Sequence, residues 1–157
     1  MPERSETPYP VRGAFTGVYG DPELDASVLM LPLFGFIPAD DPRMRSTVAL
    51  IERELTSPEG FVYRYRHERF DDGIGGREGT FNICTFWLCD NLNLQGETGR
   101  ARELFERVCR SANDLGLLSE QTDVEYGMLG NFPQAFSHLA LINSAVNIER
   151  AGQSEAR

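Results

Sequence analysis

The sequence predicts an all-α fold in which buried and amphipathic helices alternate, about five helices in all, arranged as part of an α/α toroid. One observation is that segments apolar on every side alternate with segments that have one apolar and one solvated face. The other is that connections into the buried segments are long, whereas those out of them are short, so that each short connection joins an antiparallel pair. Five helices are too few to close such a ring.

The first predicted pair begins with a buried helix. From Glu23 to Ile37 apolar residues occur on every side, which favours a helix buried all round and kinked by Pro32. Asp41 then has the position of an N-cap and Pro42 that of the first residue of an amphipathic helix, which ends before Pro58. The apolar stripe of this second helix consists of Met44, Val48, Ile51 and Leu55.

The same order then repeats. Residues Gly79 to Gln95 predict a mostly apolar helix, ended by Gly96, and Thr98 can cap the amphipathic helix that follows. A last buried helix is predicted from Pro133 through Ile148. The stripes expected along these three helices consist of Phe81, Cys84, Trp87, Leu88, Asn91 and Leu92, then Ala101, Leu104, Phe105, Val108 and Ala112, then Phe136, Leu139, Ala140, Ile142 and Val146; all but Asn91 are apolar.

The long connections indicate where a functional site would lie. Because the helices of each hairpin alternate in direction, the long segments all fall at the N-terminal end of the buried helices. They span residues 13–23, 57–78 and 116–132. Long ordered connections usually carry function, so we expect the site at this rim.

The length and composition are those of a single globular domain. The chain has 157 residues, of which 41% are hydrophobic and 25% charged. We expect this domain to cover residues 13–151, with disordered segments at 1–12 and 152–157. No apolar run approaches the ~20 residues that span a bilayer, and the N-terminus has no apolar signal region. The expected location is cytoplasmic, without a membrane partner.

The charge pattern excludes several function classes. All 15 basic residues are arginine, which excludes phosphate-loop and Schiff-base chemistry that depends on lysine. The net charge of −9 has the wrong sign for binding a nucleic acid backbone. Nucleic acid is therefore not an expected partner, and neutral solutes remain open.

Cysteine and histidine predict neither a disulfide framework nor a metal site. Cys84, Cys89 and Cys109 have no zinc-like spacing and are expected to be reduced core thiols. His67 and His138 lack partners at metal-ligand spacing. We expect His138 to be a hydrogen-bonded histidine of the last inner helix. No metal and no cofactor is predicted.

Two loops contain residues that could carry chemistry. The first loop, residues 116–132, contains the carboxylates Glu120, Asp123 and Glu125. It is either a solvated acidic loop or includes a carboxylate whose pKa is adjusted for catalysis. Glu120 is the candidate for that carboxylate, because it lies just after the apolar pair Leu117-Leu118. In residues 61–78, aromatic and arginine side chains alternate, which suits sugar recognition but also fits a charged surface turn. The glycines at 73–76 fail as a dinucleotide fingerprint because no strand and βαβ unit surrounds them.

Four strings together make a family resemblance. The sequence contains, in order, LDASVLMLPLFGFIPADDPRMRSTV, YRYR…DDGIGGREGTFNICTFW, NDLGLLSEQ and LGNFPQAFSHLALINSA. Over about Phe15 to Ala151, it closely resembles the C-terminal half of the catalytic domain of bacterial glycoside hydrolase family 15, the glucoamylases and trehalases. The resemblance implies a partial (α/α)6 barrel of alternating inner and outer helices.

The resemblance also implies residue roles in an inverting glycosidase. The Ser-Glu-Gln motif carries the general base, which makes Glu120 the catalytic candidate. Arg64 is implied as a contact to glucosyl hydroxyls, and Phe136 takes the place of a tryptophan of fungal members. The implied substrate-binding residues are Arg64, Tyr65, Glu78, Phe81, Gln121 and Phe136.

The general acid of the family lies in the upstream half of the barrel, which no segment here matches. The chain is therefore expected to be a fragment, a split gene product or a truncated reading frame. Alone it is expected to be inactive. Its expected partner is the missing N-terminal half of the barrel or a second copy of itself. The expected activity of the completed barrel is exo-acting hydrolysis of an α-glucoside or oligosaccharide. The alternative is a non-catalytic helical module that binds a sugar or a partner. The sequence leaves open whether the substrate is trehalose, a maltooligosaccharide, isomaltose or a uronic relative.

Overall fold

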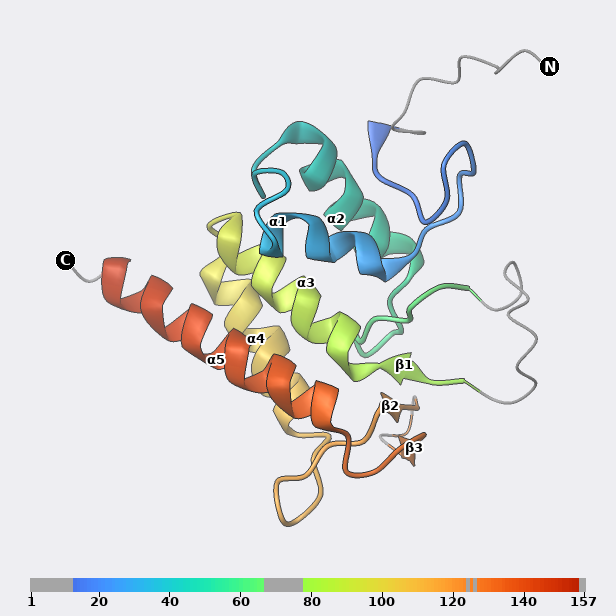
Figure 1. Cartoon of the computed structure of the whole chain (residues 1–157). Coiled ribbons are helices and arrows are strands. Elements are labelled where there is room, and N and C mark those ends of the chain that lie inside the picture. The colour runs from blue at the N-terminus through green and yellow to red at the C-terminus, as the bar shows by residue number, and fades with distance from the viewer. Residues whose placement is uncertain (1–12, 67–77, 124, 126, 156–157) are drawn as a thin grey trace.

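The protein folds into helices with one small sheet at one end (Figure 1). The structure, a computed structural model, describes residues 13–66, 78–123, 125 and 127–155. Its elements are a 3-10 helix η2 (Ala26–Leu29), α1 (Met30–Leu33), α2 (Pro42–Glu54), β1 (Thr80–Phe81), α3 (Asn82–Leu94), α4 (Thr98–Cys109), β2 (Gln121–Thr122), β3 (Met128–Leu129) and α5 (Ala135–Glu155). The predicted mostly helical class is confirmed. The expectations for segment 1–12, His67 and the glycines at 73–76 lie outside the described residues.

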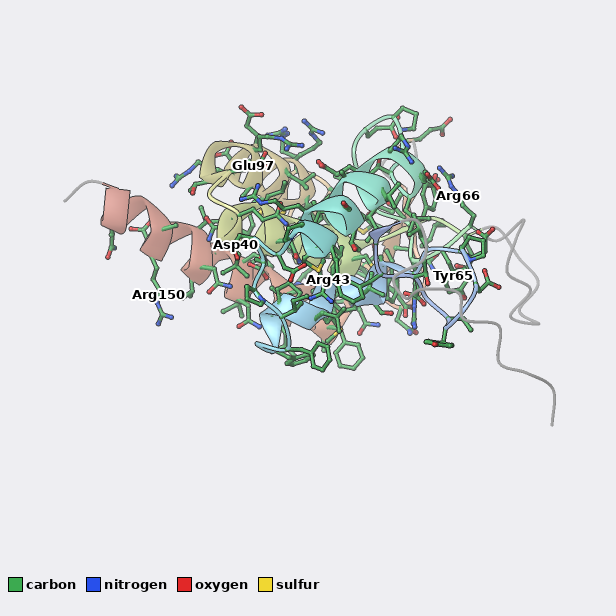
Figure 2. All side chains as sticks on the ribbon, turned by 90° about the horizontal axis from the view of Figure 1, so that it is seen from above. Asp40, Arg43, Tyr65, Arg66, Glu97 and Arg150 are labelled. Atoms are coloured by element: carbon green, nitrogen blue, oxygen red, sulfur yellow. The ribbon has the colours of Figure 1, made fainter. Side chains whose placement is uncertain are left out.

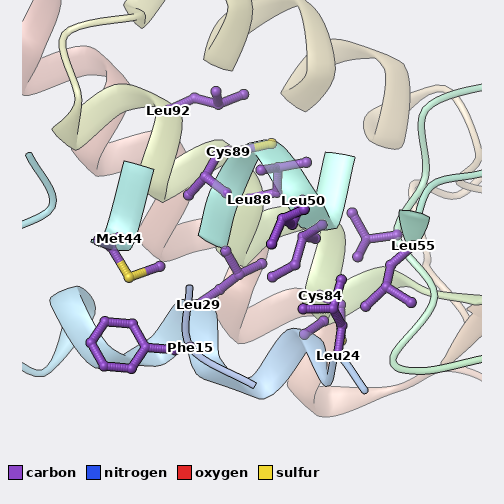
Figure 3. Packing of buried hydrophobic residues seen from close by; sticks show 14 of the residues in the cluster. Phe15, Leu24, Leu29, Met44, Leu50, Leu55, Cys84, Leu88, Cys89 and Leu92 are labelled. Carbon is purple, nitrogen blue, oxygen red and sulfur yellow. The ribbon is translucent and has the colours of Figure 1, made fainter. Parts of the chain in front are cut away.

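Helix α3 is the central element. It packs against α4, α5 and the η2–α1 segment, and Figure 1 shows α3 lying between α1 and α5. The core between η2, α2 and α3 is built from Leu29, Met44, Leu55, Cys84 and Leu88, all at most 2% exposed (Figure 3). The apolar stripe predicted for α2 therefore faces the core as expected.

The first buried helix is much shorter than predicted. Only Ala26 to Leu33 is helical, as η2 followed by α1, and Pro32 lies inside α1 without a long helix to kink. Gly35 then adopts φ +70°, a left-handed conformation that ends a helix at little cost for glycine. Phe34 and Phe36 are each 77% exposed, so the expectation of burial on every side is wrong for these two side chains.

The two outer helices differ in how they begin. Asp41 is the N-cap of α2, as predicted, because its carboxylate accepts a 2.9 Å hydrogen bond from the Arg43 backbone N–H. Thr98 is not a cap, contrary to the prediction. It is the first residue of α4 and is buried, because the turn at Gly96 starts the helix one residue earlier, with Glu97 in the cap position.

The cysteines are free thiols, as predicted. Cys84 and Cys89 are fully buried in the core, and Cys109 is half-buried on α4. Burial raises the pKa of both core thiols, which keeps them protonated and unreactive. Among the described helices, none has the length and hydropathy needed to cross a membrane.

A three-stranded antiparallel sheet was not predicted. In the order β1-β2-β3, Phe81 pairs with Gln121, and Gln121 pairs with Leu129. The second predicted buried segment therefore starts as a strand, and its helix begins at Asn82 rather than Gly79. Gly79 allows this pairing because a Cβ there would lie 2.6 Å from the Thr122 carbonyl oxygen. Strands of two residues are too short to show an alternating sequence pattern.

Helix α5 turns a different face to the core than its apolar residues suggest. Ser137, Ala140, Ser144 and Ile148 are buried against the rest of the molecule. Of the five apolar positions predicted for this helix, only Ala140 is buried; the others form what we call the open face of α5. It consists of Phe136, Leu139, Ile142 and Val146, which are between 41% and 62% exposed. The helix also continues through residues 152–155, which the sequence assigned to a disordered tail.

A carboxylate is buried between α3 and α5. Asp90 is 5% exposed, and its Oδ1 accepts a 3.1 Å hydrogen bond from Nδ2 of Asn147. Burial raises the pKa of Asp90, and the hydrogen bonds from Asn147 and Ser144 oppose this only in part. The carboxyl group of Asp90 therefore binds its proton more tightly in the folded protein than in the unfolded chain.

Replacing Asp90 by asparagine is expected to stabilise the fold near neutral pH. The contribution of a carboxyl whose folded pKa is raised is complete below the ordinary value of 3.8 and is lost as the pH rises through the folded pKa. Asp90→Asn keeps the acceptor for Asn147 and removes the buried charge, so its unfolding free energy should exceed that of the wild type at pH 7, by more than at pH 4. Urea unfolding at pH 4 and pH 7 measures this, with the exposed Asp114→Asn as the control for lost charge. A wild type more stable than Asp90→Asn at pH 7 would contradict it.

Candidate active site

The segment around Glu120 is fixed where the sheet meets the N-terminal ends of α3 and α5. The backbone N–H of Asn82 donates to the Glu120 carbonyl oxygen at 3.0 Å, and the Gln134 N–H donates to the Leu118 carbonyl at 2.9 Å. Figure 1 shows β1, β2 and β3 grouped at this one end of the molecule. The predicted meeting of the long connections at one rim is therefore observed for the segments entering α3 and α5.

Hydrogen bonds from buried side chains also fix the segment around Glu120. The Ser119 carbonyl oxygen accepts from Nδ2 of Asn82 at 2.9 Å and from Oγ of Ser137 at 2.8 Å. Oδ1 of Asn82 in turn accepts from the Thr122 hydroxyl at 2.9 Å. Residues in the first turns of α3 and α5 thus bind the residues on both sides of Glu120. Asn82 was not predicted, because nothing local marks it as the partner of a segment almost 40 residues away.

His138 supports the same segment, as predicted for a hydrogen-bonded histidine. Its Nε2 accepts from the Leu118 backbone N–H at 3.3 Å, and its Nδ1 lies 2.7 Å from the Gln134 carbonyl oxygen. With the ring proton on Nδ1, His138 donates to the Gln134 carbonyl and accepts from Leu118. Within the described residues, the His, Cys, Asp and Glu side chains form no group of three that could hold a metal ion.

The Glu120 carboxylate is half-buried and held from one side. Its Oε2 accepts from the backbone N–H of Asn131 at 3.0 Å and from Nδ2 of Asn131 at 3.1 Å. The Glu120 N–H also donates to the Asn131 carbonyl at 2.9 Å. Gly130, at φ +71°, lies so close that a Cβ there would be 2.7 Å from Oε2. Neither Gly130 nor Asn131 was predicted from the sequence; a Gly-Asn pair following a strand is the signal that could have pointed to them.

The three acidic residues of this loop have different environments. Oδ1 of Asp123 accepts from the backbone N–H groups of Glu125, at 2.9 Å, and Gly127, at 2.6 Å, so Asp123 shapes the turn between β2 and β3. Glu125 is exposed. Of the three, Glu120 combines a fixed backbone with a carboxylate at the rim.

Glu78, Phe81 and Gln121 are brought together beside Glu120. Phe81 pairs with Gln121 across β1 and β2. Nε2 of Gln121 lies 3.4 Å from Oε2 of Glu78, and Oε1 of Gln121 accepts from the Gly79 N–H at 3.0 Å. These three predicted substrate-binding residues therefore form one continuous group with the candidate base.

Arg64 and Tyr65 lie on the neighbouring segment of the same rim. The Phe81 N–H donates to the Val62 carbonyl at 2.8 Å, which joins this segment to β1. Nε of Arg64 lies 3.5 Å from Oδ1 of Asp25, and the guanidinium carbon lies 5.9 Å from the centre of the Tyr65 ring. Figure 2 shows Tyr65 at the end of the molecule opposite Arg150 of α5. The Arg64 side chain is half exposed.

Phe136 occupies the edge of this group. It lies in the first turn of α5, next to Ser137, whose hydroxyl holds the Ser119 carbonyl. Its side chain is 62% exposed and belongs to the open face of α5. Phe136 is therefore next in sequence to a residue that supports the Glu120 segment, whereas its own side chain is exposed on the open face of α5.

Known proteins with similar sequences are glycosidases. The sequence model described as "Glycosyl hydrolases family 15" matches residues 5–146. A trehalase of Mycobacterium tuberculosis (strain ATCC 25618 / H37Rv) is 53% identical over 141 residues, which are 89% of this chain and 21% of the relative. A trehalase of Thermoplasma volcanium is 45% identical over 140 residues, 88% of this chain and 22% of the relative. The chain spans about a fifth of the length of these curated relatives.

Solved glycosidase structures have the same fold. A wild-type glycosidase superposes with a TM-score of 0.70 at 22% identity, and a glycosidase variant in complex with glucose superposes with a TM-score of 0.72 at 23% identity. Each covers 88% of this chain and 39% of the solved chain. Together with the family match over most of the sequence, these findings confirm the predicted resemblance: the chain belongs to glycosyl hydrolase family 15.

Proposed function

We propose that this chain supplies the general-base side of an inverting, exo-acting α-glucosidase, with Glu120 as the base. In an inverting reaction the base takes a proton from water while the water oxygen bonds to the anomeric carbon and the glycosidic C–O bond breaks. A general acid gives the leaving oxygen its proton. The two carboxyl groups stand roughly 6.5 to 9.5 Å apart to leave room for the water.

The observation that carries this proposal is the environment of Glu120. A general base needs a carboxylate that is held in place and still reachable. Glu120 has a backbone fixed on both sides, one carboxylate oxygen bound by Asn131, and a half-buried position at the rim. A merely solvated acidic residue has no need of these contacts, which favours the catalytic role over the acidic-loop interpretation.

The acid and much of the sugar site are proposed to come from the rest of the barrel. A groove of about 700 Å³ runs between α1, α3 and α5, and its walls include Phe34, Trp87, Leu94 and Val146. The groove and the open face of α5 together form an exposed apolar surface. In a closed barrel, further helices would cover this surface. The proposed partner is therefore a polypeptide that supplies those helices, and the competing outcome is self-association.

Trehalose is the first substrate to test, because the relatives above are trehalases. The test co-expresses this chain with the part of the Mycobacterium tuberculosis trehalase that the chain does not match; we call this the complemented enzyme. We expect neither piece alone to hydrolyse trehalose and the complemented enzyme to do so. Sugar binding by the complemented enzyme without hydrolysis would instead support the alternative, a non-catalytic sugar-binding module.

Arg64→Lys is expected to reduce kcat/KM of the complemented enzyme by about 10-fold. The proposal has the planar guanidinium hold sugar hydroxyls with a fork of donors, and a lysine ammonium cannot reproduce that geometry. Steady-state kinetics on trehalose measure the change. Arg53→Lys, on the exposed face of α2 and paired with Glu54, is the control. An unchanged kcat/KM would remove Arg64 from the proposed site.

A further inference from the structure

We propose that Asn131 is a positioning residue that fixes the Glu120 carboxylate by one oxygen and leaves the other free to accept the proton of water. The inference rests on the proposed role of Glu120. Both hydrogen bonds that Asn131 donates end on the same atom, Oε2 of Glu120, at 3.0 Å from the backbone N–H and 3.1 Å from Nδ2. The carboxylate is thus bound from a single residue on the facing side of the hairpin.

The contact is built into the backbone as well as the side chain. Because Gln121 pairs with Leu129, the antiparallel register continues so that Glu120 faces Gly130. The Glu120 N–H donates to the Asn131 carbonyl at 2.9 Å, so the two residues are joined in both directions. Rotation of the Asn131 side chain alone therefore cannot release the carboxylate.

Gly130 provides the space for this arrangement. A Cβ at this position would lie 2.7 Å from Oε2 and 3.0 Å from the Cβ of Glu120, both closer than such atoms pack. The residue also has φ +71°, where other residues are strained. Any side chain at 130 would push the carboxylate away from the Asn131 donors.

The chemical consequence follows from the lone pairs of the carboxylate. Each oxygen can accept about two hydrogen bonds, so two donors saturate Oε2. Oε1 then keeps its capacity for the attacking water. Fixing one oxygen also restricts rotation of the carboxylate, and a catalytic group displaced by about 1 Å can lose about 100-fold in rate. Asn131 would thus act through Glu120 without touching substrate.

The identity of residue 131 separates this role from a structural one. Aspartate has the shape of asparagine but carries no donor and adds a like charge beside Glu120. Alanine removes the donor without adding a charge. If the side chain only fills the turn, Asn131→Asp should be milder than Asn131→Ala. If it holds the carboxylate, the order is reversed.

We expect kcat of the complemented enzyme to fall by about 10-fold in Asn131→Ala and by about 100-fold in Asn131→Asp, with KM within about twofold in both. The loss of one hydrogen bond to a charged group accounts for the first value. Asn113 is the matched control, because its Oδ1 accepts from the backbone N–H groups of Leu115 and Leu117. Asn113→Asp keeps this acceptor and should therefore destabilise the fold less than Asn113→Ala. Neither variant of Asn113 should change kcat. Gly130→Ala should lower kcat like Asn131→Ala.

A second measurement on the full 157-residue chain needs no activity. In ¹⁵N-¹H NMR spectra, the backbone and side-chain amide signals of Asn131 should both shift in Glu120→Gln, by more than those of Asn113. The inference would be overturned if the amide signals of Asn131 did not shift in Glu120→Gln. It would also be overturned if Asn131→Asp were at least as active as Asn131→Ala. If Glu120→Gln itself kept full activity, the proposed function would fail instead, so the two failures are distinguishable.

Discussion

Glu120→Gln is expected to lower kcat of the complemented enzyme by on the order of 10²- to 10⁴-fold, the typical loss when one acid–base partner is removed. Glutamine keeps the size of the side chain and an oxygen that can accept from Asn131, but it cannot take the proton of water. The backbone bonds from Asn82 and to Asn131 involve no side-chain atom of Glu120, so the fold should persist. Glucose release from trehalose measures the rate, and circular dichroism checks the fold.

Two neighbouring carboxylates serve as controls for this result. Asp123→Asn should have a smaller effect, because Asp123 shapes the turn and an amide oxygen still accepts from Gly127. Glu125→Gln, at an exposed position, should have a small effect as well. A larger loss at either position than at Glu120 would assign the base to a different residue.

The double substitution Leu139→Gln and Ile142→Gln is expected to prevent complementation. These residues are 57% and 56% exposed on the open face of α5, where the proposed partner helices would bury them. Burial of such a side chain contributes about 1.5 to 3 kcal/mol, so the pair should change the association constant by more than about 100-fold. Trehalose hydrolysis at fixed concentrations of the two pieces measures the loss.

The same surface predicts the behaviour of the chain alone. The wild-type chain should self-associate through its exposed apolar side chains, and the double variant should do so less. Sedimentation velocity over a dilution series compares them. Glu106→Gln, on the exposed side of α4, is the control for a polar change away from this face. A compact wild-type monomer that is stable to dilution, without dye-binding apolar surface, is the contrary result.

Local signals in the sequence were sufficient to predict where α2 begins and that His138 is hydrogen-bonded in the fold. The cap at Asp41 and the proline that follows act within one turn, so neighbouring residues alone determine where α2 begins. Helix α5 was harder, because apolar residues cover more than one of its sides. Its core face includes the small residues Ser137, Ala140 and Ser144, whereas four of its larger apolar side chains lie on the open face. Hydrophobicity alone therefore selected the wrong side of that helix.

The sheet and the contacts of Glu120 depend on residues that are distant in sequence. Thr80 pairs with Thr122 through a register that no two-residue strand can encode locally. Asn131 reaches Glu120 only because the hairpin folds back between them. The sequence therefore predicts Glu120 as the base only through the family motif, whereas its contacts with Asn82, Gly130 and Asn131 became apparent only in the fold.

The stereochemistry of trehalose hydrolysis tests the central claim most directly. Inversion turns the attacked glucose into the β-anomer while the departing glucose remains α, so ¹H NMR at early times should show the two anomers in equal amounts. This signal should be present in the complemented enzyme and nearly absent in its Glu120→Gln variant. Initial release of α-glucose alone would mean retention, and undiminished release by the variant would mean a different base; either result would contradict Glu120 as the general base of an inverting glycosidase.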